Sequence, residues 1–337
     1  MKTGKCSCGA KVFFDNSQCI ACGKLLGHCD RCDEIAAFIP TTIAQQFACS
    51  SCGTTTKSCR NRRFGVCNSQ IPTDNGKSLC DWCEFTEVVP SLDDHSNVQK
   101  WKELEKSKRQ LLSQLWTFRL PPHPNFDGDE KPLRFRFLAD SVDENGNVVR
   151  TVTGHADGII TININEADSV YREKQRIKLR EPQRTLIGHL RHEYGHYLDW
   201  CIPQSKRSSY IELFGDPQAI PYSDAMERYY AGQRLQNWRA SYVSEYASMH
   251  PWEDFAESVN LYLDILAVAQ TAKQSSLPRE MTIDVATDDM TKIVIKTLKV
   301  AVLVTEINSD MGLPPLLPEN IPEAVLRKLG YVHSLRG

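Results

Sequence analysis

The sequence predicts an α+β protein, with a small cysteine-rich module followed by a mainly helical domain that carries a small antiparallel sheet. Twelve of the thirteen cysteines lie before residue 84, and apolar residues alternate with polar ones in short runs between residues 133 and 165. Apolar residues recur at helical spacing over much of the remaining chain. We expect three parts: the cysteine-rich module at residues 1–90, a linker and connecting helix at 91–120, and the main domain at 121–337.

The bulk composition is that of a globular protein. The chain has 337 residues, of which 41% are hydrophobic and 24% are charged, and its formal net charge is −2. A net charge so close to zero does not indicate a nucleic-acid partner. No apolar run approaches the length of a membrane span, and the N-terminus lacks the apolar core of a signal peptide. We therefore expect a cytoplasmic protein with no membrane contact.

The early cysteines have the spacing of zinc ligands. A C-x-x-C pair places two thiolates on one tight turn, and two such turns complete a tetrahedral Zn–S₄ site. Clustered cysteines without an export signal favour zinc over disulfides. Taken in order, the twelve divide into three tetrads: Cys6, Cys8, Cys19 and Cys22; Cys29, Cys32, Cys49 and Cys52; and Cys59, Cys67, Cys80 and Cys83. The sequence therefore predicts a zinc-ribbon domain at residues 1–90 with two or three structural zinc ions.

The pairing of these cysteines is not settled by spacing alone. The second tetrad has zinc-ribbon spacing, whereas Cys59 and Cys67 of the third do not form a close pair. Cross-brace pairing, only two filled sites, and an iron–sulfur cluster stay open as alternatives. A Zn–S₄ site has no open coordination position, so we expect these sites to hold the fold and to support docking of a protein partner. Zinc-loaded tetrads are net negative, which disfavours nucleic acid as a partner despite a small basic patch at Arg60, Arg62 and Arg63.

A charged helix and a β region follow the cysteines. Apolar residues recur at helical spacing from about 97 to 117. The run 133–137 alternates, Asn145-Gly146 is a hairpin signal, and residues 159–165 alternate again as in a half-buried or edge strand. His155 lies in the preceding turn. Two hypotheses stay open for it: that it lines a site, or that it only forms part of the turn.

Residues 192–196 read His-Glu-Tyr-Gly-His, an H-E-x-x-H motif. On a helix, residues four apart share a face, so His192 and His196 can reach one metal ion. Glu193 then lies beside the ion, where it can take a proton from water. We expect the helix to open at Pro182 and to end before Pro203. His189 lies on the same stripe, and we expect it to support the ligands rather than to bind metal.

Catalytic zinc normally takes three protein ligands, and the sequence has no third histidine at metzincin spacing. The best third ligand is Glu253, on a helix that begins at Pro251. Glu257, one turn further, would then accept a hydrogen bond from a ligand histidine. Three other carboxylates stay open as the third ligand: Asp254, Asp216 and Asp224.

Two further questions concern the region around these helices. Several tyrosines could donate a hydrogen bond in the transition state, and the sequence selects none of them: Tyr229, Tyr230, Tyr242 and Tyr246. Cys201, at the end of the metal helix, is expected to be a buried structural thiol, with a fourth zinc ligand as the alternative.

Together these motifs resemble the family of zinc-binding metallopeptidases with an N-terminal zinc-ribbon domain. The resemblance covers nearly the whole chain and is carried by these segments: residues 65–68, 80–83, 154–168, 189–200, 212–216 and 250–257. It implies a zincin-like fold, and H-E-x-x-H with a downstream glutamate is similar to the gluzincins. It also implies a peptide or protein substrate, bound in extended form along an edge strand at residues 159–165.

We expect a zinc-dependent peptidase in which His192, His196 and Glu253 hold the catalytic zinc and Glu193 is the general base. One alternative is an adaptor protein, in which the zinc ribbons bind a partner and the H-E-x-x-H site is structural or inactive. The other alternative is a metal-dependent hydrolase of a non-peptide bond. The sequence does not predict the cleavage specificity or the oligomeric state.

Overall fold

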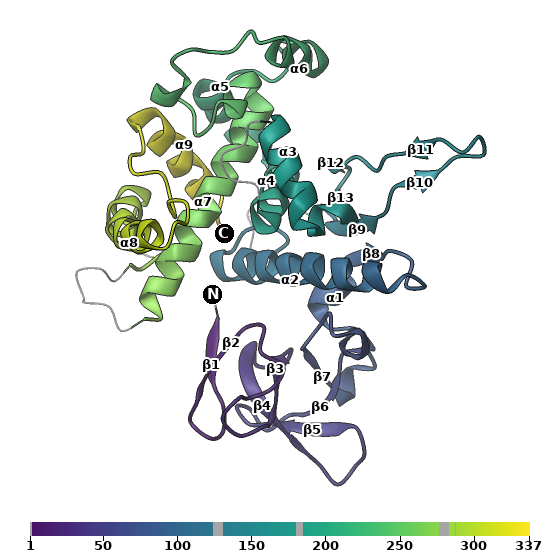
Figure 1. The fold of residues 1–337 in the computed structure, drawn as a ribbon. Helices are drawn as coiled ribbons and strands as arrows, with labels where there is room; N and C mark the ends of the chain where they lie inside the picture. Colours follow the sequence, from purple (N-terminus) through teal and green to yellow (C-terminus); the bar gives the residue numbers. More distant parts are fainter. Residues whose placement is uncertain (1, 124–130, 180–184, 276–282, 287) are drawn as a thin grey trace. The chain divides into compact units, whose positions relative to one another are not determined.

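The computed structural model describes residues 2–123, 131–179, 185–275, 283–286 and 288–337. The α+β class is confirmed, with a cysteine-rich N-terminal region followed by a helical domain (Figure 1). The chain forms two compact units, and the second consists mainly of residues 179–337. The first contains residues 1–112, 134–153 and 161–178, and the second also contains residues 113–133 and 154–160.

The first unit begins with a two-stranded hairpin and a small closed barrel. The hairpin pairs β1 (Thr3–Lys5) with β2 (Lys11–Phe13). The barrel consists of β3 (Leu25–Cys29), β4 (Glu34–Pro40), β5 (Gln46–Cys49), β6 (Thr55–Ser58) and β7 (Gln70–Pro72). The pairing of Cys29 with Gln70 closes the barrel, and Cys29, Ala36, Phe38 and Cys49 form one of its buried clusters. The cysteines thus form part of a core that contains few large apolar residues, in agreement with a metal-stabilised module.

The next part of the chain contains a long helix and several short strands, and it contributes residues to both units. Its elements are α1 (Asp81–Glu84), β8 (Thr86–Val88), α2 (His95–Phe118), β9 (Arg134–Leu138), β10 (Ser141–Val142), β11 (Val148–Val149), β13 (Ile159–Asn163) and α3 (Ser169–Leu179). The hairpin at Asn145-Gly146 is present, but it joins β10 to β11 and does not return along β9. Strand β9 instead pairs in parallel with β8, because the connection between them passes through helix α2.

The prediction of an edge strand at residues 159–165 is wrong. Strand β13 lies between β9 and β12 (Gly154–Ala156), so it is an inner strand and β12 is the edge. The side chains of Ile160 and Ile162 are fully buried, as the alternation predicted, but Asn163 is buried too. Its amide donates hydrogen bonds to Asp140 and to the Thr151 carbonyl, so its polarity is satisfied inside the unit and does not mark an exposed edge.

The second unit is built around helix α7 (Pro251–Lys273), which contacts α4, α8 and α9 (Figure 1). The other helices are α4 (Leu186–Cys201), α5 (Arg207–Phe214), α6 (Tyr222–Tyr230), α8 (Met290–Asp310) and α9 (Glu323–Ser334). The Thr185 side chain caps α4 by accepting a hydrogen bond from the Gly188 amide, whereas Pro182 lies outside the described residues. None of the described helices is long and apolar enough to cross a membrane.

Helices α4 and α7 approach closely at Gly195. A Cβ atom at this position would lie 2.6 Å from the Cα atom of Ala256. Gly195 stands between the two motif histidines, and the residues around Ala256 include Glu253. The absence of a side chain at position 195 therefore lets the two helices bring these groups together.

Gly195→Ala is expected to lower the free energy of unfolding by about 1–3 kcal/mol, because its methyl group would overlap the α7 backbone. The matched control is Gly330→Ala in α9, where an added Cβ would meet no atom within 4 Å. Better helix propensity should make this control more stable by about 0.5–1 kcal/mol. Chemical denaturation of both variants measures the difference, and equal stability of the two would contradict the close crossing.

Candidate metal centre

Helix α4 presents the two motif histidines one turn apart. The Nε2 atoms of His192 and His196 are 3.2 Å apart, and the His196 side chain is buried. The ring of His196 packs on the ring of Trp252, with 4.0 Å between the ring centroids. Both imidazoles are thus oriented with one nitrogen toward the same point.

Helix α7 brings Glu253 to this point. The His250 side chain caps the helix by accepting a hydrogen bond from the Trp252 amide, and Pro251 occupies the first position. Glu253 lies in the first turn and is buried. Its Oε2 atom is 3.1 Å from His192 Nε2, and its Oε1 atom is 3.7 Å from His196 Nε2.

These three side chains have the geometry of a zinc site. One donor atom from each lies within 4.8 Å of the others, so the three can surround one ion. Tetrahedral ligands at ordinary Zn–N and Zn–O distances lie roughly 3.3–3.5 Å from one another, close to the separations found here. Glu253 Oε2 is buried and accepts no well-formed hydrogen bond from the described residues, which a bound cation would remedy. The residues present therefore fit a zinc ion.

Hydrogen bonds hold two of the three ligands. His192 Nδ1 is 2.7 Å from Glu257 Oε1, so a proton on Nδ1 leaves Nε2 unprotonated toward the metal. The Ser244 hydroxyl donates to the other oxygen of Glu257 over 2.9 Å. The Tyr222 hydroxyl donates to Glu253 Oε1 over 2.7 Å. The orientation of the donors is thus set before a metal binds.

The general-base candidate, Glu193, lies on the same helix and is buried. His189 Nε2 is 3.4 Å from Glu193 Oε1, so His189 contacts the candidate base and is not one of the grouped metal ligands. Burial alone would raise the pKa of Glu193, but the His189 hydrogen bond and the nearby histidines outweigh it and lower the pKa. Glu193 is therefore ionised near neutral pH.

The charges around the ligands are arranged for a cation. Burial favours neutral His192, but the close contact with the Glu253 carboxylate and the hydrogen bond with Glu257 outweigh it and raise the pKa of His192 well above the usual value. Burial likewise opposes ionisation of Glu253, yet the contacts with His192 lower its pKa to about 2. Burial lowers the pKa of His196 to about 4. A proton on His192 and a metal ion therefore compete for the same position.

The alternative third ligands lie elsewhere. Asp254 is 2.6 Å from Lys328 Nζ, and burial raises its pKa to about 7 despite this lysine. Asp216 and Asp224 are exposed, and neither belongs to the histidine group. Cys201 is fully buried but is not in this group either.

The cysteines form the three tetrads that their order in the sequence suggested. Sulfur–sulfur distances within the tetrads are 3.5 Å for Cys6–Cys22, 3.8 Å for Cys8–Cys19, 3.9 Å for Cys29–Cys52, 4.0 Å for Cys32–Cys49 and 3.6 Å for Cys67–Cys80. The edges of a Zn–S₄ tetrahedron measure roughly 3.8 Å. No disulfide joins the cysteines of the described chain. The third tetrad, the least regular in sequence, is the most deeply buried.

The glycines after Cys8, Cys22 and Cys52 form tight turns. Their φ angles are +90° at Gly9, +73° at Gly23 and +75° at Gly53. Each donates its amide to the carbonyl of a cysteine in the same tetrad, over 2.8–2.9 Å. Glycine is suited to these positions because side chains disfavour this backbone region.

Three residues around the candidate centre were not singled out from the sequence: Tyr222, Ser244 and Trp252. Tyr222 is the first residue of α6 and Ser244 lies in the loop before α7, so neither belongs to a motif helix. Of the tyrosines considered as donors, Tyr246 packs near the centre, with its ring centroid 6.1 Å from that of His192. Tyr242 instead packs against Lys328, and Tyr229 packs against Tyr230.

His155 lies in a tight turn next to helix α4. Asp157 and Gly158 have positive φ angles of 48° and 81°, and the Gly158 amide donates to His155 Nε2 over 3.1 Å. The His155 ring also packs near the rings of Tyr197 and Trp200. The turn thus explains the local sequence, and it also positions His155 beside the motif helix.

Comparisons with known proteins identify the family of both parts of the chain. The family model described as "putative zinc-binding metallo-peptidase" matches residues 97–335, and a zinc-ribbon domain model matches residues 4–94. Uncharacterized proteins of Mycobacterium tuberculosis and Mycobacterium bovis are each 34% identical over 336 residues, covering 98% of this chain and 93% of their own length. No solved structure matches the chain.

Metal analysis of the purified chain is expected to give four zinc atoms per chain, one for each grouped set of ligands. His196→Ala should lower the count to three, because it removes a donor from one group alone. Elemental analysis after dialysis against metal-free buffer makes the measurement. Three zinc atoms in the unaltered chain, with no loss in the variant, would show that the histidine group holds no zinc.

Glu257→Ala is expected to weaken zinc binding at the histidine group by about 10–100-fold, because it removes the carboxylate that orients His192. Ser244→Ala, which removes only the hydroxyl bonded to Glu257, should cause a smaller loss. Competition with a chromogenic chelator gives both affinities. Equal affinities for Glu257→Ala and the unaltered chain would contradict the positioning role.

Proposed function

The chain belongs to the family of zinc-binding metallopeptidases, and we propose that it is a zinc-dependent peptidase whose active site is the His192, His196 and Glu253 group. The observation that carries this proposal is the convergence of these three donors from α4 and α7 beside the buried carboxylate of Glu193. Three protein donors leave a coordination position open, which a catalytic site requires and a structural site lacks.

Bound Zn²⁺ would supply a Lewis acid that polarises the scissile carbonyl and makes water more acidic. Glu193 accepts the proton of the attacking water and passes it to the leaving amine. His189 holds the Glu193 carboxylate, while Glu257 and Tyr222 hold the ligands His192 and Glu253. The residues of the chain thus orient the metal ligands and transfer the proton. Their burial strengthens the electrostatic interactions on which both depend.

The substrate in this proposal is a peptide or protein in extended form. Strand β12 is the edge of its sheet and contacts helix α4. An edge strand offers backbone groups that can pair with an added strand, which gives affinity without dependence on side chains. We assign peptide binding to β12 in place of residues 159–165.

The three-part division into residues 1–90, 91–120 and 121–337 belongs to the same proposal. In this proposal the ribbon domain binds structural zinc and docks a protein partner. The middle part links the two domains, and the last part cleaves the peptide substrate. The saturated Zn–S₄ geometry of the tetrads supports a non-catalytic role for the first part. We also propose that the protein acts in the cytoplasm, where free thiols persist to bind metal.

Glu193→Gln is expected to keep the full zinc content and to lower kcat by about 10²–10⁴-fold, since the amide cannot accept the proton. The control is Glu212→Gln, an exposed residue of α5 whose change should leave kcat unaltered. Digestion of a broad peptide library, followed by mass spectrometry, measures both. Undiminished cleavage by Glu193→Gln would exclude this residue as the base.

The same digest separates the peptidase from the alternatives. Cleavage that disappears with a chelator and returns with added zinc supports the proposal. Absence of cleavage by a chain with four bound zinc atoms would instead favour a non-peptide substrate. Absence of cleavage with an empty histidine group would favour an adaptor.

A further inference from the structure

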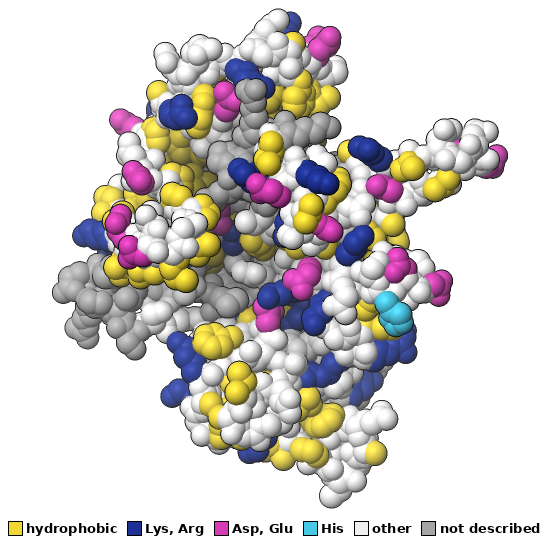
Figure 2. Space-filling model, in the orientation of Figure 1, with side chains coloured by type: hydrophobic (Ala, Val, Ile, Leu, Met, Phe, Trp, Pro, Cys, Tyr) yellow, Lys and Arg dark blue, Asp and Glu magenta, His cyan; other side chains and the backbone are white. Residues whose placement is uncertain are grey.

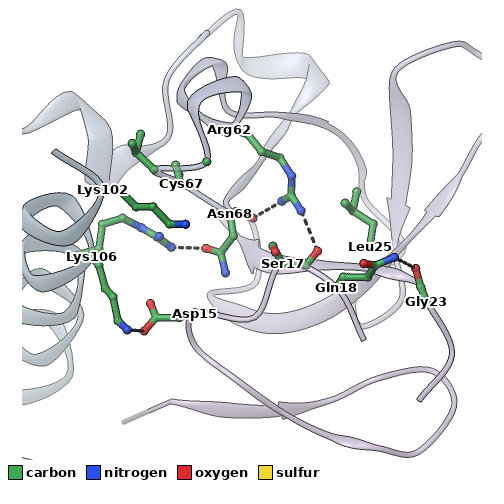
Figure 3. A pocket seen from close by; sticks show the side chains of 13 residues that line it. Asp15, Ser17, Gln18, Gly23, Leu25, Arg62, Cys67, Asn68, Lys102 and Lys106 are labelled. Carbon is green, nitrogen blue, oxygen red and sulfur yellow. Dashed lines mark hydrogen bonds and ion pairs between the residues drawn. The ribbon is translucent and has the colours of Figure 1, made fainter. Parts of the chain in front are cut away.

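A second feature lies in the first unit, apart from the candidate metal centre. It is a cavity of about 520 Å³ lined by the loop after β2, the loop that precedes Asn68, and the polar face of α2 (Figure 3). The lining contains these charged residues: Asp15, Arg62, Lys102, Lys106 and Arg109. Four cations thus share the cavity with one carboxylate.

The two arginines form hydrogen bonds within the first unit. Arg62 donates to the carbonyl oxygens of Ser17, Leu26 and Asn68. Arg109 is buried and donates to the Asn68 side chain. Their charges also face Cys67, which lines the same cavity and belongs to the third tetrad. A Zn–S₄ site is net negative, so it offsets these arginines.

The two lysines are different, because they are exposed. They stand four residues apart on α2 and therefore on one face of the helix. Lys106 lies 3.5 Å from Asp15, and its side chain is 52% exposed. For Lys102 the described part of the chain provides no ion-pair partner, and its ammonium group points into the cavity (Figure 3). Figure 2 shows Lys and Arg side chains grouped beside α2 on this unit.

The remaining lining is partly apolar. Leu25 is half-buried and contributes aliphatic surface, while Ser17 and Gln18 contribute polar groups. Val66 also lines the cavity, but it is buried. No aromatic side chain is among the described lining residues, so the cavity lacks a platform on which a nucleobase could stack. The carboxylate of Asp15 also repels a polyphosphate. These features favour peptide carboxylates next to aliphatic side chains over a polyphosphate.

We propose that this cavity docks an acidic peptide segment of a protein, with a Glu or Asp side chain at Lys102 and Lys106 and an aliphatic side chain against Leu25. The site is separate from the peptidase centre and does not depend on catalysis. It gives the ribbon unit a specific way to recognise a partner or a substrate.

The test uses the full-length, zinc-loaded chain carrying Glu193→Gln, so that the probe is not cleaved. The probe is a fluorescein-labelled Gly-Leu-Glu-Leu-Glu-Gly peptide, and fluorescence anisotropy measures its binding. A peptide with Gln in place of each Glu should bind at least about fivefold more weakly, and added NaCl should weaken the binding of the acidic peptide.

The double variant Lys102→Gln and Lys106→Gln should bind the acidic peptide about fivefold to tenfold more weakly. The matched control is Lys5→Gln with Lys11→Gln, which removes two exposed charges from the β1–β2 hairpin of the same unit and should bind normally. Changing both α2 lysines to Arg should retain binding. Zinc content and circular dichroism verify that each variant is folded.

Three results would overturn the proposal: equal binding of the acidic and Gln peptides, unchanged binding by the Lys102 and Lys106 variant, or tighter binding of a fluorescein-labelled oligothymidine than of the acidic peptide. The last result would assign the cavity to nucleic acid.

Discussion

The close crossing of α4 and α7 is the constraint on which the candidate centre depends. His192 and His196 come from one helix and Glu253 from the other, and the helices can touch only because position 195 has no side chain. A larger residue there would separate the backbones and move Glu253 away from the histidines. The glycine inside the motif is therefore a packing requirement of the site, independent of any chemistry of its own.

The same crossing buries several charges, and the fold neutralises those that do not serve the centre. Arg191, beside the first histidine, bonds to Gln114 and Asp264. Asp254, beside the third ligand, pairs with Lys328. Unpaired buried charges are costly, so these partners are part of what makes the helices stable. His192, His196 and Glu253 are different, because one bound cation could neutralise their charge and take up their donor atoms.

Local spacing explains which parts of this arrangement the sequence could predict. The motif helix, the helix that begins at Pro251 and the three cysteine tetrads depend on neighbours within a few turns of the chain, so their patterns are visible in the sequence. The closed barrel and the parallel β8–β9 pair depend on strands that meet through distant connections. Tyr222 at the start of α6 and Ser244 in the loop before α7 reach the site from outside the two motif helices, so only the three-dimensional structure identifies them. The inner position of β13 was missed because the buried amide of Asn163 has the same sequence signature as an exposed one.

The number of protein donors, rather than the metal, separates the two kinds of site in this chain. Each cysteine tetrad offers four sulfur donors, which would close the coordination shell of a zinc ion and stabilise a module with few large apolar residues. The histidine group supplies three donors. A fourth protein ligand would make it structural as well, and Cys201, the remaining cysteine, is the obvious candidate. It stands five residues after His196, which turns it well away from the face shared by the two histidines. The helical repeat therefore keeps the thiol out of the coordination shell and leaves the position beside Glu193 available for water.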